Sequence, residues 1–314
     1  MIASGALATA TALVLGLIPV LSLFWLYAVL LLDALGGAVK DVAMDGIMVE
    51  EGQPRGMTGR IQSIQWGSLT AALVIAGVAG GYIAEHFDYH VSFKLVALFP
   101  ALVALLAFRY QEPPPAPVAR QRPLTEVLKN RQLLLAMLFL FLLWFSPSFG
   151  VPLSFKMRDD LHFSKLYMGF LMTLGSACSI LGAVWYWNVS HRIDLKRWLG
   201  IGTVVSGLST FAYLYLTPVS LIVYTVLFGI CSMAVQLIIM DFSARICPAG
   251  REATTFALIM SVLNFGTFLS GIVGGALYEL VGYHWLVVIS GTTTLACLFL
   301  IPSLKVQPAD RATG

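Results

Sequence analysis

The sequence predicts an all-α membrane protein that crosses the bilayer many times and is arranged as two helical bundles. Of its 314 residues, 58% are hydrophobic and 11% are charged, whereas charge occupies about a quarter of a soluble globular domain. Apolar runs of about 20 residues, the length that spans a bilayer as a helix, follow one another along almost the whole chain. The net charge of +3 is too small and too dispersed to indicate nucleic-acid binding.

Ten apolar segments can be delimited between polar or helix-breaking residues. They lie at residues 2–18, 21–48, 62–84, 91–108, 132–153, 166–188, 198–216, 219–242, 254–280 and 284–303. The fifth segment contains Ser146-Pro147-Ser148 and Pro152, so we expect a bent helix there.

The distribution of basic residues predicts the orientation of the chain. The loops after the second, fourth, sixth, eighth and tenth segments hold 14 of the 19 lysines and arginines, and the opposite loops hold three. Basic residues concentrate in cytoplasmic loops. Both termini are therefore expected in the cytoplasm, with a bacterial inner or plasma membrane as the first expectation and an organelle envelope as the alternative.

An internal repeat relates two parts of the chain at an offset of 194 residues. The stretch at 76–90, AGVAGGYIAEHFDYH, aligns with SGIVGGALYELVGYH at 270–284, and six of the fifteen positions are identical. Asp45 likewise corresponds to Asp241 with a shift of two residues. The repeat predicts a first bundle at 1–108 with four segments, a cytoplasmic linker at 109–131, and a six-helix second bundle with a short tail at 132–314.

The two predicted bundles are unequal, with four segments before the linker and six after it. Subtracting the repeat offset from Gln132 places the corresponding start of the first bundle about 62 residues before Met1. That length accommodates two more helices. We therefore expect a 6+6 arrangement whose first two helices are missing, with a ten-helix protein of unequal halves as the alternative.

Several local motifs carry a resemblance to a known family. They are DVAMDGIMVE at 41–50, RIQSIQWG at 60–67, AGVAGGY at 76–82, and ARICPAGREATTFALIMSVLNFGTFLSGIVGGAL at 244–277. These motifs resemble the folate-biopterin transporter branch of the major facilitator superfamily. The loop WNVSHRIDLKR at 187–197 departs from the superfamily's Gly-x-x-x-Asp-Arg pattern. The resemblance implies two bundles that move a folate or pterin, with protons, by alternating access.

Charged residues inside the second apolar segment are the first candidates for substrate binding or proton coupling. Asp33 lies nearest the midplane, and Lys40 follows two turns later on almost the same face. Asp41 and Asp45 lie one turn apart on one face. Charge at this depth is costly and usually functional. Two adjacent carboxylates seldom both ionise in a low dielectric, so the pair could carry a proton or bind the two N–H donors of a pterin edge.

Polar residues elsewhere extend this list to the third, eighth and ninth segments. They are Gln65, Trp66, Gln236, Asp241 and Asn264. The Trp66 indole could stack on a heteroaromatic ring whose edge Gln65 contacts, with an interfacial anchor as the alternative for Trp66. Polar groups at this depth face a bundle interior more often than lipid. Each of them alone fits an interhelical contact equally well.

Charged residues at the cytoplasmic helix ends are expected to form a gate network. They are Glu50, Arg55, Arg60, Arg245, Arg251 and Glu252. Arg55, Arg60 or Lys40 could instead neutralise the Asp41–Asp45 pair in a purely structural network.

Taken together, the residues predict a secondary active carrier rather than an enzyme. The resemblance implies a pteridine or folate as the substrate, protons and the lipid bilayer are the other expected partners, and we expect no cofactor and no metal. A carrier of a sugar, organic anion or drug is the first alternative. A membrane-embedded aspartate-rich transferase is the second, but it would need two acidic clusters to hold Mg²⁺, and the second half offers Asp241 alone at that position.

Overall fold

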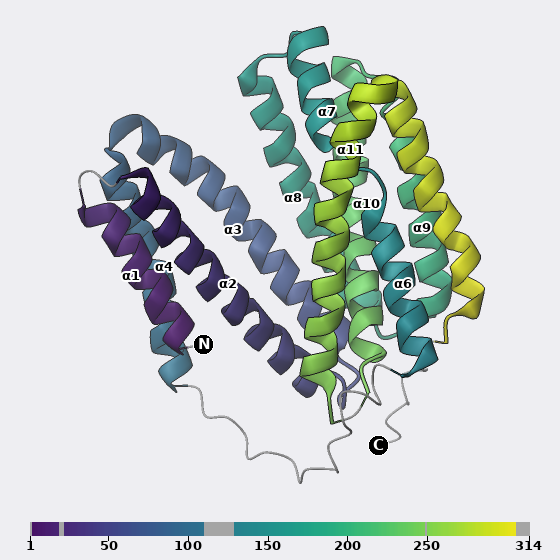
Figure 1. The fold of residues 1–314 in the computed structure, drawn as a ribbon, viewed down its shortest axis with the longest axis horizontal. Coiled ribbons are helices and arrows are strands. Elements are labelled where there is room, and N and C mark those ends of the chain that lie inside the picture. Colours follow the sequence, from purple (N-terminus) through teal and green to yellow (C-terminus); the bar gives the residue numbers. More distant parts are fainter. Residues whose placement is uncertain (1, 19–21, 110–128, 249, 306–314) are drawn as a thin grey trace. The chain divides into compact units, whose positions relative to one another are not determined.

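The computed structural model describes residues 2–18, 22–109, 129–248 and 250–305. Every regular element in these ranges is a helix, which confirms the all-α class (Figure 1). The part before the linker contains α1 (Ile2–Leu17), α2 (Leu23–Gly52), α3 (Thr58–His86) and α4 (Tyr89–Arg109). The part after it contains α6 (Arg131–Phe145), α7 (Gly150–Phe155), η1 (Lys156–Asp160), α8 (Lys165–Val189), α9 (Leu195–Ala212), α10 (Pro218–Arg245), α11 (Glu252–Ala296) and η2 (Cys297–Ser303).

Local sequence signals set the starts of several helices. Asn130 caps α6 by accepting hydrogen bonds from two backbone N–H groups of its first turn, and Asp194 caps α9 in the same way. Thr217 and Ser220 form a reciprocal capping box at α10, where Pro218 occupies the first helical position. These polar caps satisfy backbone donors that the helix itself leaves unpaired.

Two predicted interruptions are present. The fifth segment is broken between Phe145, where α6 ends, and Gly150, where α7 begins, so the predicted bend is confirmed. Between the ninth and tenth segments, Gly282 has φ 75° and ψ 177°, a backbone conformation that favours glycine, and divides α11 into two arms.

Six helical segments in the described ranges are long and apolar enough to span a membrane. They are Leu23–Gly52, His90–Arg109, Arg131–Asp160, Tyr167–Val189, Pro218–Arg245 and Glu252–Ser303. Their surfaces carry large apolar side chains, among them Trp25, Phe99 and Phe299, which is 86% exposed. Such a surface suits contact with lipid. The count of ten transmembrane segments stays a prediction.

The chain divides into two compact units, each of which combines two separate stretches of the sequence. One unit contains Met1–Met48 and Ile75–Gln121, and the other contains Val49–Val74 and Arg122–Gly314. The second unit thus includes the end of α2 and the first half of α3 together with the helices that follow the linker. The bundle boundaries at 108 and 132 remain a prediction.

In the first unit, α1 packs along α4 and also touches α2. A Cβ atom at Gly5 of α1 would lie 3.1 Å from the carbonyl oxygen of Pro100 in α4. At Gly36 of α2, a Cβ atom would lie 3.2 Å from the Leu7 side chain of α1. Glycine at these positions lets the helices approach closely, as is common between membrane helices.

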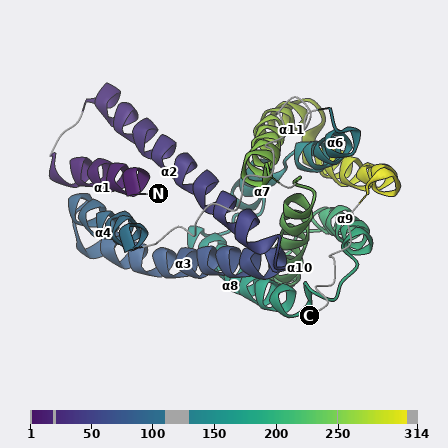
Figure 2. The ribbon, with the colours of Figure 1, turned by 90° about the horizontal axis from the view of Figure 1, so that it is seen from below.

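In the second unit, α10 lies against both α8 and α9, and α11 lies against α6 and α9 (Figures 1 and 2). The α8–α10 crossing is tight, because a Cβ atom at Gly182 would lie 2.4 Å from the Ile230 carbonyl oxygen. At the α6–α11 contact, a Cβ atom at Gly266 would lie 3.1 Å from the Phe141 carbonyl oxygen. Close packing at these glycines holds α8 against α10 and α11 against α6.

Candidate functional site

A carboxylate is completely buried near the end of α10. The residues from Leu237 to Ala244 are all buried, and Asp241 among them is 0% exposed. A buried charge is destabilising unless it is paired and hydrogen-bonded. The surroundings of Asp241 therefore have to supply donors, and they do so from three helices.

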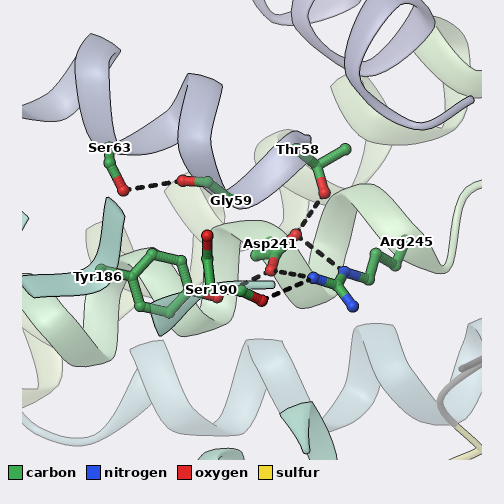
Figure 3. Close-up of polar contacts among 7 residues, drawn as sticks. All are labelled: Thr58, Gly59, Ser63, Tyr186, Ser190, Asp241 and Arg245. Atoms are coloured by element: carbon green, nitrogen blue, oxygen red, sulfur yellow. Dashed lines mark hydrogen bonds and ion pairs between the residues drawn. The ribbon is translucent and has the colours of Figure 1, made fainter. Parts of the chain in front are cut away.

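Four hydrogen bonds reach the Asp241 carboxylate (Figure 3). The Thr58 hydroxyl donates to Oδ1, and the Tyr186 hydroxyl donates to Oδ2 at 2.8 Å. One turn along α10, Arg245 donates from Nε to Oδ1 at 3.0 Å and from Nη2 to Oδ2 at 2.7 Å. We refer to Thr58, Tyr186, Asp241 and Arg245 as the Asp241 cluster. Both carboxylate oxygens are fully satisfied, and the charge is neutralised within the cluster.

The start of α3 fits closely against this cluster. A Cβ atom at Gly59 would lie 2.8 Å from the Ser190 Cβ atom and 2.9 Å from the Oδ2 atom of Asp241. These distances are shorter than a normal carbon contact, so the site requires glycine. Arg245 Nη2 also donates to the Ser190 carbonyl oxygen at 3.4 Å, which ties the end of α8 to the end of α10.

The Asp241 cluster joins residues from both parts of the repeat. Thr58 and Gly59 precede the linker, whereas Tyr186, Asp241 and Arg245 follow it. The sequence places this end of α10 and the start of α3 on the predicted cytoplasmic side.

A second contact between the repeats lies close by in sequence. Gln53 Nε2 donates to the Cys247 carbonyl oxygen at 2.8 Å, and these two positions are separated by 194 residues, which equals the repeat offset. Burial, reinforced by the negative charge of Glu252, raises the pKa of the Cys247 thiol well above its usual range. Cys247 is therefore an unreactive thiol rather than a nucleophile.

Basic and aromatic side chains lie beside the cluster at the ends of α3 and α8. The Arg60 guanidinium lies 5.6 Å from the centre of the Trp187 ring. Arg192 Nε donates to His191 Nε2 at 2.9 Å. Desolvation of the ring, together with the positive charges of Arg60 and Arg192, lowers the pKa of His191.

Two of the predicted site residues meet in the Asp241 cluster, namely Asp241 and Arg245. Sequence reasoning missed their partners Thr58 and Tyr186. Tyr186 lies in a Trp-Tyr-Trp run that is typical of a membrane interface. Thr58 directly precedes Gly59-Arg60, a pair that recurs at residues 250–251. This recurrence is the sequence feature that could have pointed to Thr58.

The three aspartates of α2 lie in the first unit. The Asp33 carboxylate accepts a hydrogen bond from the Thr11 hydroxyl of α1 at 2.8 Å. Asp33 and Asp41 are exposed, whereas Lys40 and Asp45 are partly buried.

The remaining candidates are spread over the second unit. Gln65, Trp66 and Gln236 are partly buried, and Asn264 is exposed. Among the charged candidates, Arg55 forms an ion pair with Glu51, Glu50 is exposed, and Arg251 and Glu252 are partly buried. The described ranges contain no group of three or more His, Cys, Asp or Glu side chains that could hold a metal ion.

Solved structures define the class of the fold. The chain is similar to the human organic anion transporter MFSD10 with a TM-score of 0.75 and 14% identity, covering 96% of this chain and 76% of that one. It is also similar to a bacterial homologue of the iron transporter ferroportin in an outward-facing state, with a TM-score of 0.65, 15% identity and coverage of 96% and 82%. The protein therefore has the fold of the major-facilitator-like transporters.

The family follows from the sequence. The BT1 family model matches residues 1–306, so the chain belongs to the BT1 family. A Synechocystis protein named folate-biopterin transporter is 27% identical over 311 residues, which cover 90% of this chain and 62% of that protein. Folate transporter 1 of Plasmodium falciparum is 24% identical over 45% of this chain and 30% of its own length. The chain thus spans less than two thirds of either relative, and the resemblance to folate-biopterin transporters is confirmed.

The relatives also bear on the enzyme alternative. Both are named as transporters, as is a probable folate-biopterin transporter of Arabidopsis thaliana that is 28% identical over 51% of this chain and 35% of its own length. The aspartate-rich transferase therefore finds no support among them. Family and apolar helices together identify an integral, multi-pass membrane protein.

Proposed function

We propose that this protein carries folate or a pterin across a membrane by alternating access coupled to protons. The single observation that carries the mechanism is the Asp241 cluster, in which Thr58 of the first repeat donates to a buried carboxylate of the second. Family membership and the names of the relatives support the substrate class.

The donors of Asp241 fit a contact that opens and closes. If the start of α3 moves away from α10, Asp241 loses the Thr58 hydrogen bond but keeps Tyr186 and Arg245, which both belong to the second repeat. Its charge stays neutralised by Arg245 in either position. Opening then costs about 1.5–3 kcal/mol, the typical value of one hydrogen bond to a charged group, a cost that substrate binding can offset.

This arrangement assigns proton coupling to the acids of α2 rather than to Asp241. The oxygens of Asp241 already have partners in one arginine and two hydroxyls. Asp33 has a hydroxyl partner and is exposed, and Asp41 and Asp45 lie one turn apart. For the neighbouring pair we expect Asp41→Asn, Asp45→Asn and the double variant to lose uphill uptake to the same extent, because the two carboxylates act as one unit.

Transport by the full chain in lipid vesicles tests the function. With the inside alkaline, we expect vesicles to accumulate labelled folate or biopterin without added Mg²⁺, and we expect unlabelled pterins to compete. A sugar and a lipophilic cation serve as controls and should not compete. If either control competes and the pterins do not, the carrier transports another organic solute and the pterin assignment is wrong.

A further inference from the structure

The Thr11 hydroxyl of α1 contacts the Asp33 carboxylate of α2. Thr11 lies on α1 and is 5% exposed. Its Oγ1 atom is 2.8 Å from Asp33 Oδ1, and it is also 3.1 Å from the Leu7 carbonyl oxygen and 3.0 Å from that of Ala8. One hydroxyl hydrogen therefore faces three acceptors. A hydroxyl has one donor and two acceptor sites, so this group can change direction without moving its oxygen.

This geometry satisfies Asp33 in both of its protonation states. When Asp33 is ionised, the Thr11 hydroxyl donates to the carboxylate. When Asp33 is protonated, its own O–H can donate to Thr11 Oγ1, and the Thr11 hydrogen turns to the carbonyl oxygen of Leu7 or Ala8. The buried Thr11 hydroxyl would oppose either state if it were left unpaired in that state. A hydroxyl avoids this in both.

We propose that Thr11 is a positioning residue that keeps Asp33 hydrogen-bonded while Asp33 gains and loses a proton. The proposal rests on the proton-coupled transport proposed above and deepens it. Thr11 acts through Asp33 and need not touch the substrate.

The charged groups in the neighbourhood of Asp33 lie farther from it than the Thr11 hydroxyl does. The sequence of α1, which packs against α2 where Leu7 meets Gly36, contains no charged residue. On α2 itself the nearest charges are Lys40 and Asp41, seven and eight residues away, or about 10–12 Å along the helix. The other helix packed on α1 is α4, whose Lys94 lies against Gly16, five residues or about 7.5 Å along α1 from Thr11. Thr11 is thus the direct partner, and these charges act at longer range.

Thr9 provides a matched control on the same helix. Its hydroxyl donates to the Gly5 carbonyl oxygen at 2.7 Å, within α1 itself. Thr9→Val removes the same atoms from the same helix as Thr11→Val. The two variants differ in whether the lost hydroxyl faces Asp33.

Infrared titration in lipid vesicles tests the proposal on the full chain without substrate. The band of a protonated carboxyl group that disappears in Asp33→Asn reports the protonation of Asp33 between about pH 4 and 9. In Thr11→Val we expect the midpoint of this band to move upward by about one pH unit, because a hydrogen bond to a charged group is stronger than one to a neutral group by about that amount. Thr11→Ser keeps the hydroxyl and should restore the parent midpoint, and Thr9→Val should leave it unchanged.

The same series distinguishes this proposal from the function on which it rests. An unchanged midpoint in Thr11→Val, an equal shift in Thr9→Val, or the absence of an Asp33 band that titrates would overturn the role of Thr11. A parent protein that shows the expected band shifts but takes up no pterin would contradict the proposed function, while the band would still establish how Thr11 serves Asp33.

Discussion

Asp33 and Asp241 both lie in helices long enough to span a membrane, but their surroundings are opposite. Asp241 is 0% exposed and receives four hydrogen bonds, two of them from Arg245. Asp33 is exposed, and its described partner is the neutral hydroxyl of Thr11. Asp241 is thus enclosed by donors from three helices, whereas Asp33 lies at the surface of its unit.

The contrast separates two tasks that sequence alone cannot separate. Both residues are acids inside apolar helices, and such acids are generally functional. Arg245 makes the difference, because Asp241 has a charged partner within hydrogen-bond distance and Asp33 has a neutral one. We therefore propose that Asp241 holds helices together and that Asp33 transfers protons.

Removing the charge of Asp241 should have the largest effect on stability. Asp241→Asn leaves the partly buried Arg245 guanidinium without its counter-charge, and breaking a buried ion pair costs about 3–5 kcal/mol. Unfolding in mixed micelles, followed by tryptophan fluorescence, measures the loss. Asp33→Asn is the matched control and should change the unfolding free energy by less than about 1 kcal/mol. Equal losses in both variants would remove the contrast between the two sites.

Removing one hydroxyl from the Asp241 cluster should have a smaller effect. Tyr186→Phe deletes the donor to Oδ2 and keeps the ring, so we expect a loss of about 1.5–3 kcal/mol. Tyr167→Phe is a suitable control, because its hydroxyl donates to a neutral backbone carbonyl at the exposed end of α8. The same unfolding measurement applies. A loss no greater than that of the control would show that Tyr186 contributes packing alone.

Adding one methyl group tests the close fit of α3. Gly59→Ala introduces a Cβ atom 2.8 Å from that of Ser190, and such overpacking costs about 1–3 kcal/mol. At Gly271 of α11 no atom lies within 4 Å of an added Cβ. Gly271→Ala should therefore be neutral or slightly stabilising, by up to about 1 kcal/mol. A neutral Gly59→Ala would mean that the start of α3 is not fixed against α8 and α10.

The sequence was sufficient for the class of the fold and for many helix boundaries, because apolar runs and helix-breaking residues act locally. Ser146-Pro147-Ser148 and Gly282 mark breaks that can be read directly. The repeat at an offset of 194 residues identified Asp241 as the counterpart of an acid in α2.

The partners of these acids could not be predicted, because they come from other helices. Nothing in the order of residues shows that Thr58 reaches Asp241 across 183 positions, or that Thr11 reaches Asp33 across 22. Asp45 and Asp241 are sequence equivalents, so the repeat by itself suggests equal roles for them. Hydrogen-bond partners depend on packing, and packing is where the two repeats differ.

Proton movement that accompanies transport tests the central claim most directly. Vesicles containing the full chain and a trapped pH-sensitive dye report the protons that enter with each folate or biopterin molecule. We predict that Asp33→Asn abolishes this proton entry at parent-like stability, whereas Tyr186→Phe keeps the parent ratio of protons to substrate even where transport is slower. If Asp33→Asn moves as many protons per substrate as the parent, or if Tyr186→Phe alters the ratio, the division of tasks between Asp33 and Asp241 is wrong.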